Sequence, residues 1–318
     1  MRVIRVHQFG GPEVLRLETV ANPFALIGRD PVLGPEEVWV ELKAIGVNPV
    51  ETYLRSGSNP QLPLPYTPGS DGAGLVKGVG SAVHHLAVGE RVYVAGSLTG
   101  TYAQETLCQR DQVYPLPDSI RFGQGAALFV PYATAYRALF QRGRGIPGER
   151  VLIHGASGGV GIAAIQWAKA AGLRIMGTAG SERGLELLKE QGCDGICNHR
   201  QPGYIEELRS WTQGEGYDLI LEMLANLNLE GRVLVVGNRG RVEINPRQAM
   251  SQESSILGVM LYKASPKEMQ SIHAAIGAGL RSGTLNPVTG RELDLADAAQ
   301  AHQAVLESGA YGKILLIP

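Results

Sequence analysis

Residues 151–166, VLIHGASGGVGIAAIQ, begin as an apolar run, break into closely spaced glycines and continue as a helix former. A strand, a glycine-rich turn and a helix together form a setting in which backbone N–H groups and the helix N-terminus receive a pyrophosphate. Gly158 lets the backbone approach the phosphates without a Cβ, and Gly161 lets the helix pack closely on the strand. Ala156 replaces the first glycine of the usual G-x-G-x-x-G spacing, so a tight turn without a ligand is the alternative.

The surrounding pattern supports the nucleotide interpretation. From residue 151 onward, apolar strand-like runs alternate with amphipathic helical stretches, which predicts an α/β fold with a parallel, doubly wound Rossmann sheet. The preceding part consists of short alternating segments such as VWVELKAIGV, separated by glycine and proline, which predicts a compact β domain. We therefore expect a β-rich domain formed by residues 1–124 and 264–318, to which the C-terminal ILLIP strand returns, and a Rossmann domain over residues 125–263.

Composition narrows the class of protein. The chain has 318 residues, a formal net charge of -1 and 44% hydrophobic residues, so it has no global positive field that would recruit nucleic acid or an anionic membrane. It contains three cysteines, which argues against a disulfide framework and suits a reducing compartment. The N-terminus lacks a long apolar segment of the secretory type. We expect a soluble, cytoplasmic protein without a membrane span.

The stretch GTAGSER, about twenty residues beyond the glycines, bears on the choice of dinucleotide. NAD enzymes carry an acidic residue there for the ribose hydroxyls, whereas NADP enzymes carry small polar and basic groups. Here Gly180 and Ser181 stand where the acid is expected, and Arg183 follows. NHR, after the next strand, adds two more candidate phosphate partners, His199 and Arg200. The stretch favours NADPH, although the neighbouring Glu182 keeps NAD open. If the stretch is only a solvated charged loop, it indicates no preference between the two cofactors.

Several quoted segments together resemble a known family: FGGPEVL, GVNPVETYLRSG, LPYTPGSDGAG, PYATAYRAL, HGASGGVG, EMLAN, VEINPR and ESSILGV. The chain resembles the zinc-free medium-chain dehydrogenase/reductases, and within them the NADPH:quinone oxidoreductases of the zeta-crystallin type. The resemblance covers nearly the whole chain. It implies a GroES-like catalytic domain joined to a Rossmann domain. It also implies a homo-oligomer, a dimer or commonly a tetramer, in which the SSILGVMLY strand extends the sheet across a subunit pair.

The same resemblance allows the metal ligands to be compared. Zinc-dependent relatives place a Cys, a His with a neighbouring Glu, and a second Cys around a catalytic zinc. At the matching positions this sequence has Asn48, Ser70 with Asp71, and Val130. Asn, Ser and Val supply neither the thiolate nor the imidazole that binds zinc tightly. We therefore predict no metal.

Without a metal, hydrogen bonds must polarise a carbonyl substrate, and Asn48 and Tyr53 are the catalytic candidates. The resemblance implies that Tyr53 replaces a proton-relay histidine and lies beside the nicotinamide. Its phenol would then donate a hydrogen bond or a proton to an oxygen that gains charge. The alternative is that Tyr53 only lines the pocket or contacts the cofactor.

Further cofactor contacts are implied by position. Thr134 would approach the nicotinamide, unless it only caps a helix. The diphosphate would meet Ser157, Gly158, Gly159 and Val160. The nicotinamide half would be flanked by Asn228, Val236, Gly237, Asn238 and Arg239.

Two segments depart from the family pattern. ANLNLEG, residues 225–231, is the only link between two strands that should be parallel, and a parallel crossover usually needs about a dozen residues or more. A crossover helix is therefore expected to be missing, which would expose a face of the Rossmann sheet and displace Asn228. FALIGRD, residues 24–30, is an extra segment that a surface loop would tolerate.

The function implied is NADPH-dependent reduction of a quinone in an interdomain cleft without a metal. The nearest alternative is reduction of an activated C=C bond in an enone or alkenal, which needs the same cofactor and a similar pocket. An alternative of another class is a non-catalytic crystallin-like protein or one that binds AU-rich RNA. Because the sequence has no RNP-like aromatic motif and no basic stripe, RNA would have to use the nucleotide site.

Overall fold

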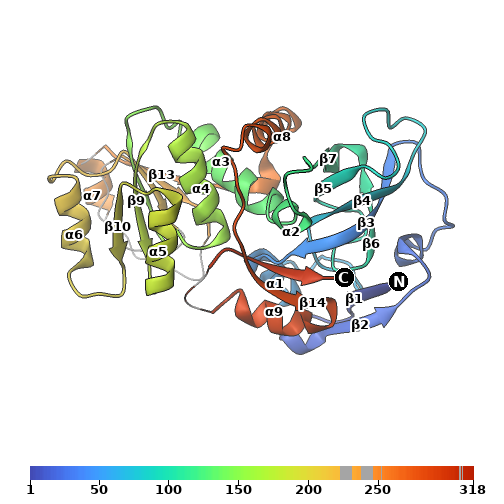
Figure 1. Ribbon diagram of the computed structural model, residues 1–318. Helices are drawn as coiled ribbons and strands as arrows, with labels where there is room; N and C mark the ends of the chain where they lie inside the picture. Colours follow the sequence, from blue (N-terminus) through green and yellow to red (C-terminus); the bar gives the residue numbers. More distant parts are fainter. Residues whose placement is uncertain (223–230, 238–245, 252, 308, 310) are drawn as a thin grey trace. The chain divides into compact units, whose positions relative to one another are not determined.

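The computed structural model describes residues 1–318 except 223–230, 238–245, 252, 308 and 310 (Figure 1). The described part of the chain divides into two units. The first unit comprises Met1–Val130, Pro287–Glu307 and Lys313–Pro318. The second comprises Pro131–Asn286 and Ser308–Gly312. The chain thus returns to the first unit twice after leaving it.

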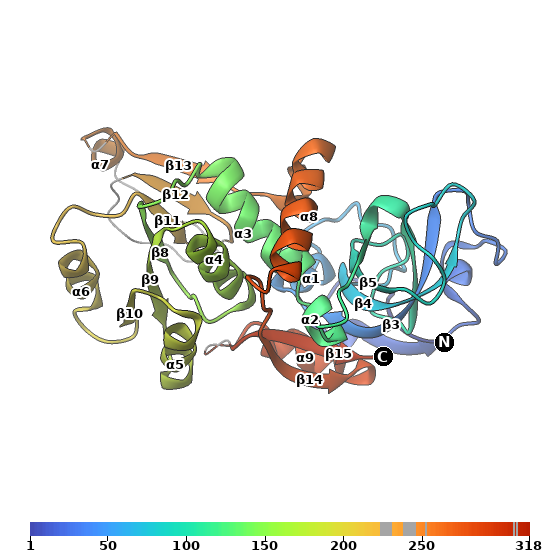
Figure 2. The same cartoon turned by 45° about the horizontal axis from the view of Figure 1, so that its top comes forward.

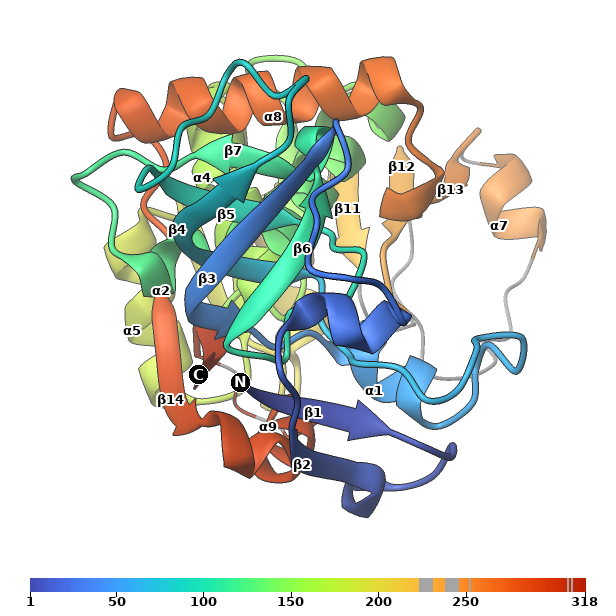
Figure 3. The same cartoon turned by 90° about the vertical axis from the view of Figure 1, so that its right-hand side faces the viewer.

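The first unit contains a sheet in the order β14-β15-β3-β4-β5-β7, with β6 paired to β3 (Figure 3). A separate antiparallel pair is formed by β1 (Arg2–Val6) and β2 (Leu15–Thr19). The other strands are β3 (Glu37–Gly46), β4 (Asp71–Val79), β5 (Arg91–Ala95), β6 (Glu105–Gln109), β7 (Val113–Pro115), β14 (Thr289–Asp294) and β15 (Lys313–Ile317). The helices are α1 (Pro49–Arg55), α2 (Phe122–Gly125) and α9 (Ala298–Ala304), with short 3-10 turns η1 (Pro12–Val14), η2 (Pro23–Ile27), η3 (Arg110–Gln112) and η7 (Leu295–Asp297).

The alternating pattern of the N-terminal segments places apolar side chains in one core. Val38, Val40 and Leu42 of β3 are buried together with Val92 and Val94 of β5, as the two-residue period of a strand requires. The sheet leaves β4 and β15 on either side of β3. This order brings the start of α1, the start of β4 and the start of β15 together.

The second unit contains a sheet in the order β10-β9-β8-β11-β12-β13, in which the paired strands are parallel (Figure 2). This is the doubly wound order, so the predicted Rossmann sheet is confirmed. The strands are β8 (Arg150–Ile153), β9 (Arg174–Ala179), β10 (Gly195–Asn198), β11 (Leu219–Glu222), β12 (Arg232–Val235) and β13 (Ser255–Gly258). The helices are α3 (Thr134–Tyr136), η5 (Arg137–Arg142), α4 (Gly159–Ala170), α5 (Glu182–Gln191), α6 (Tyr204–Trp211), α7 (Pro246–Ser251), η6 (Leu261–Lys263) and α8 (Pro266–Arg281), preceded by η4 (Phe129–Ala133), which begins in the first unit.

The shortened crossover leaves the strand pairing intact. β11 and β12 pair in parallel although only residues 223–231 join them. The link itself, residues 223–230, lies outside the described residues. Ile220 and Val233, which face each other across this pair, are both buried, so the expected exposure of the sheet is not observed at these positions. Asn228 itself lies outside the described residues.

The extra segment at 24–30 packs on the first unit. Asn22 caps η2 by accepting a hydrogen bond from the Ala25 N–H. Phe24 is fully buried and meets Trp39 edge to face, with ring centroids 5.4 Å apart. Arg29 forms an ion pair with Glu37. The insertion is therefore anchored to β3 at both its apolar and its charged end.

None of the described helices combines the length and the apolar character needed to cross a bilayer.

Candidate functional site

The predicted glycine loop joins β8 to α4 in the second unit. Gly155 has a φ of 64°, in the left-handed region that glycine adopts easily. Gly158 is the N-cap of the twelve-residue helix α4. A Cβ on Gly161 would lie 2.5 Å from the Ala156 Cα, which no real side chain tolerates. The loop can therefore place its backbone N–H groups at the N-terminus of α4 only with glycine at position 161.

The other predicted nucleotide contacts lie at the same edge of the sheet. Because β8, β9, β10 and β12 are parallel, the residues that follow each strand meet at the carboxyl edge. The glycine loop follows β8, Gly180 follows β9, His199 follows β10 and Val236 follows β12. This edge is where nucleotides bind in doubly wound sheets.

Basic side chains gather around Gly180. A Cβ on Gly180 would lie 2.8 Å from both the His199 Nε2 and the Arg200 Nε. Ser181 caps α5 by accepting a hydrogen bond from the Gly184 N–H. Arg183 lies over the ring of Tyr311, 3.7 Å from its centroid. Two basic side chains, His199 and Arg200, thus lie against Gly180 at the end of β9.

Thr178 links two histidines beneath this edge. Its Oγ1 lies 3.1 Å from the Nδ1 of His154 and 3.1 Å from the Nδ1 of His199. Burial, and then the charge of its neighbour His199, lower the pKa of His154 to about 4. Burial, followed by the nearby Arg200 guanidinium, lowers the pKa of His199. Both rings are therefore mainly neutral at pH 7.

The remaining nucleotide candidates are placed in part. Thr134 is buried and follows a helical Ala133, so the interpretation that Thr134 is only an N-terminal cap is wrong. The helix begins earlier, at η4. Gly237 follows Val236 directly after β12, and both are partly buried. Asn238 and Arg239, like Asn228, lie outside the described residues.

In the first unit, Asn48 begins α1 and is almost completely buried. Its backbone N–H donates to Glu51 Oε2 at 2.7 Å, which closes the first turn of the helix. Its side-chain amide donates to Glu51 Oε1 at 3.1 Å and to Asp71 Oδ2 at 3.0 Å. An amide nitrogen carries two hydrogens, so both donors of Asn48 are already engaged.

Glu51 lies at the centre of a buried polar chain. The Tyr102 hydroxyl donates to Glu51 Oε2 at 2.8 Å and lies 3.0 Å from the Nε2 of His302. Arg55 approaches the other nitrogen of that ring. Burial raises the pKa of Glu51 to about 7, against the opposing attraction of the Lys313 ammonium. Burial, and then the Arg55 charge, lower the pKa of His302 to about 3.

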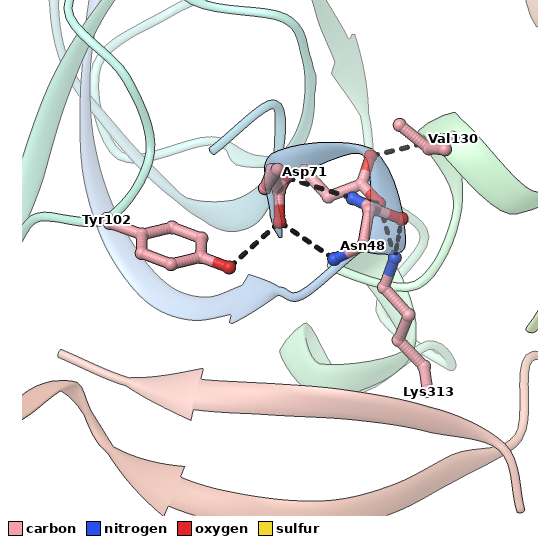
Figure 4. Close-up of polar contacts among 6 residues, drawn as sticks. Asn48, Asp71, Tyr102, Val130 and Lys313 are labelled. Atoms are coloured by element: carbon pink, nitrogen blue, oxygen red, sulfur yellow. Dashed lines mark hydrogen bonds and ion pairs between the residues drawn. The ribbon is translucent and has the colours of Figure 1, made fainter. Parts of the chain in front are cut away.

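Lys313 brings a cation into this cluster (Figure 4). Its ammonium donates to Asp71 Oδ2 at 2.7 Å and to the Asn48 Oδ1. Asp71 Oδ1 accepts from the Val130 N–H at 2.9 Å. The lysine and the aspartate are 4% and 0% exposed. A buried charge pair of this kind stays charged only when both partners are fully hydrogen bonded.

Asn48, Asp71 and Val130, which the family resemblance matched to zinc-site positions, lie together in this cluster. The cation among them is the Lys313 ammonium. Within the described ranges, no group of three or more His, Cys, Asp or Glu side chains could hold a metal ion.

Tyr53 lies on α1, five residues after Asn48, and is partly exposed. The structure adds that Tyr53 lies on a short helix whose first turn is closed by the hydrogen bond from Asn48 to Glu51.

Sequence reasoning did not find Glu51, Tyr102, His302 or Lys313 as members of one site. Tyr102 and His302 are 200 positions apart, so no local pattern could join them. One signal was available: Lys313 is a single charge at the head of the apolar run KILLIP. A lysine at the start of a buried strand requires a partner.

Comparisons with known proteins agree with this architecture. Residues 34–118 match the alcohol dehydrogenase GroES-like domain, and residues 159–276 match the domain family described as zinc-binding dehydrogenase. The two matches fall in different units of the structure.

Individual relatives cover the full chain. A quinone oxidoreductase of Homo sapiens is 46% identical over 329 residues, which cover 100% of this chain and 98% of that protein. The solved Escherichia coli quinone oxidoreductase, complexed with NADPH, has a TM-score of 0.84 and 30% identity and covers both chains completely. A solved NAD-dependent alcohol dehydrogenase superposes with a TM-score of 0.89 at 29% identity, again over both whole chains. Together with the GroES-like and Rossmann units, these likenesses show that the chain belongs to the quinone oxidoreductase family of the medium-chain dehydrogenase/reductases.

Proposed function

We propose that this protein binds NADPH and reduces quinones without a metal. The observation that carries the proposal is the carboxyl edge of the second unit, where the glycine loop, Gly180 and two basic side chains lie at the ends of neighbouring parallel strands. This edge fits a phosphorylated dinucleotide, because position 161 tolerates only glycine and the His199 and Arg200 side chains lie directly against Gly180, where a Cβ would come 2.8 Å from each. When bound, the cofactor would supply the hydride.

The residues that would hold the cofactor follow from their strand ends. Ser157, Gly158, Gly159 and Val160 would donate to or line the diphosphate at the N-terminus of α4. Val236 and Gly237, after β12, would flank the nicotinamide half together with Thr134. Asn228, Asn238 and Arg239 keep the role that the family resemblance implies.

The preference for NADPH over NADH would come from the end of β9. The 2′-phosphate needs cations and hydrogen-bond donors, and an acidic side chain there would repel it. His199, Arg200 and Ser181 supply donors, and Arg183 supplies a further charge. Glu182 is the first residue of α5, directly after Ser181.

Tyr53 would donate the hydrogen bond or proton to the substrate oxygen. Asn48 is less suited to this step, because both hydrogens of its amide are engaged by Glu51 and Asp71. Its contribution would be to hold the first turn of α1 and so the position of Tyr53. Polarisation of the oxygen would then depend on a phenol and not on a Lewis acid.

Metal independence is supported by the Lys313 ammonium. The cluster that corresponds to a zinc site in metal-dependent relatives already contains this cation, bonded to Asp71 and Asn48. A second cation there would face strong repulsion at short range.

We also propose that β13 joins two copies of the chain. β13 is an edge strand, and Ile256, Met260 and Tyr262 on and after it are 47%, 60% and 51% exposed. An exposed apolar edge strand pairs readily with another strand. Light scattering should give an oligomeric mass for the protein and a lower mass for Ile256→Lys, whereas a monomeric mass for the wild type would contradict the proposal.

A cofactor titration tests the nucleotide assignment. Nicotinamide fluorescence should show that NADPH binds more tightly than NADH. In a His199→Ala/Arg200→Ala variant, the NADPH affinity should fall at least about tenfold while the NADH affinity changes little, since each lost charge-assisted contact acts on the 2′-phosphate. If NADPH and NADH affinity fell by the same factor, His199 and Arg200 would not bind the 2′-phosphate. Product analysis with a quinone and with an enone then separates quinone reduction from reduction of a C=C bond.

A further inference from the structure

The ammonium of Lys313 is buried in the cluster that it forms with Asn48, Glu51 and Asp71. Its side chain reaches Asp71 Oδ2 and Asn48 Oδ1 within the first unit. The residue before it, Gly312, belongs to the second unit, where its N–H donates to the Ser157 carbonyl at 3.0 Å. Gly312 also forms a bridge with Gly158. Each side of the Gly312 to Lys313 peptide bond is therefore tied to a proposed functional segment.

Lys313 decides which way the Asn48 amide faces. An ammonium only donates hydrogen bonds, so it requires the oxygen of Asn48, and it leaves the nitrogen to face Glu51 and Asp71. If the amide were turned over, its nitrogen would oppose the ammonium and its oxygen would oppose a carboxylate. Glu51 in turn accepts from the backbone N–H of Asn48 and closes the first turn of α1. The orientation of one amide is thus linked to the start of the helix.

We propose that Lys313 is a positioning residue for the reduction, which acts through Asn48 to fix the first turn of α1 and with it Tyr53. The inference rests on the proposed function, because it assigns Lys313 a part in quinone reduction. As a positioning residue, Lys313 would not touch the substrate. Misplacement of a catalytic group by about an ångström is enough to lower a rate by a large factor.

The competing explanation is that Lys313 only neutralises Asp71. Removal of one partner of a buried pair leaves an uncompensated charge, so a single Lys313→Met change would harm folding under either explanation. The double variant Lys313→Met/Asp71→Asn separates them, because it removes both charges and preserves the shape of Asp71. It leaves Asn48 Oδ1 without the ammonium donor.

The experiment measures melting temperature, NADPH affinity, and kcat and KM for a quinone such as 1,4-benzoquinone. We expect the double variant to melt closer to the wild type than Lys313→Met does and to bind NADPH within twofold. Its kcat should remain at least about tenfold below the wild type. A kcat that recovers together with the melting temperature would overturn the proposal.

A matched control makes the same changes at an exposed pair. Arg2 and Asp294 form an ion pair in the first unit with side chains 36% and 49% exposed. Arg2→Met/Asp294→Asn should keep kcat within twofold of the wild type. Absence of NADPH-dependent quinone reduction in the wild type itself would contradict the proposed function and is distinguishable from a failure of the Lys313 assignment.

Lys313→Arg serves if the double variant does not fold. Arginine retains the charge that Asp71 needs, but its planar head places the donors differently. A positioning role predicts at least a threefold loss of kcat in this variant with NADPH affinity within twofold. An unchanged kcat would show that the geometry of the ammonium is irrelevant and would overturn the proposal.

Discussion

The phenol of Tyr53 is the group on which the proposed proton transfer depends. It lies on α1, which also carries the buried Glu51 and begins at the fixed Asn48. We predict that Tyr53→Phe lowers kcat for a quinone about a hundredfold, since general acid catalysis contributes roughly 10²–10⁴ in rate. NADPH affinity should change by less than threefold. Steady-state kinetics together with a fluorescence titration would measure both quantities.

Tyr204→Phe is the matched control for this prediction. Tyr204 is also a partly buried tyrosine on a short helix, α6, and it belongs to the second unit. Its substitution should leave kcat unchanged. A Tyr53→Phe enzyme with the rate of the control would mean that Tyr53 only lines the pocket, which is the alternative that the sequence left open.

At the residue scale, local signals predicted one half of the candidate site better than the other. The glycine loop and Gly180 could be located because glycine, strand and helix are close in the sequence. Asp71 and Lys313 are 242 positions apart, and they meet only because β15 and β4 both pair with β3. Because the contact between Asp71 and Lys313 depends on the order of strands in the sheet, no characteristic spacing in the sequence predicts it.

Among the elements, the β8–α4 turn has the strictest steric requirement. We predict that Gly161→Ala weakens NADPH binding at least tenfold and lowers the melting temperature, because the new Cβ would lie 2.5 Å from the Ala156 Cα and 2.6 Å from its carbonyl oxygen. The loop would have to move away from the N-terminus of α4. Thermal unfolding and an NADPH titration measure the two effects.

Gly277→Ala is the control within a helix of the same unit. A Cβ at position 277 meets only the end of the flexible Arg281 side chain, at 3.3 Å. Alanine in the interior of α8 should raise stability by about 0.5–1 kcal/mol, because glycine costs helix entropy. NADPH affinity should stay the same. If Gly161→Ala behaved like this control, the loop would not need its close packing.

The elements also show where periodicity fails. The alternation of strands and helices predicted β8 through β12 because each apolar run is bounded by a turn signal. Thr134 was a candidate cap at the start of a helix, but the helical run begins earlier, with the π-helical turn η4 at Phe129–Ala133. Thr134 therefore lies inside a helical run.

At the scale of the whole molecule, buried histidines make stability depend on pH. Burial lowers the pKa of His154 and His273 to about 4, and burial followed by the Arg55 charge lowers that of His302 to about 3. The unfolded chain binds protons on these rings near pH 6.5, so stability present above that pH is lost as the pH falls. Each histidine contributes up to about 1.4 kcal/mol per pH unit.

Glu51 opposes this trend. Its folded pKa of about 7 lies above the value of the unfolded chain, so its contribution is lost as the pH rises from about 4.5 to 7. Three histidines outweigh one carboxyl, and we predict a lower melting temperature at pH 5 than at pH 7. Calorimetry at both values provides the measurement. A melting temperature that is unchanged or higher at pH 5 would contradict the assigned burial of these groups.

Changes of composition and period along the chain predicted boundaries after residues 124 and 263, whereas the two units of the structure meet after Val130 and after Asn286. The helix α8 (Pro266–Arg281) therefore belongs to the second unit and not to the first. The short link between β11 and β12 was expected to expose the sheet, but parallel pairing persists and Ile220 stays buried.

The most direct test of the account is the oxidation of NADPH by a quinone, followed at 340 nm with protein that has been dialysed against a metal chelator. We predict quinone-dependent oxidation that is faster with NADPH than with NADH and is unaffected by the chelator. No oxidation, or oxidation that returns only when zinc is added back, would contradict metal-free quinone reduction by this chain.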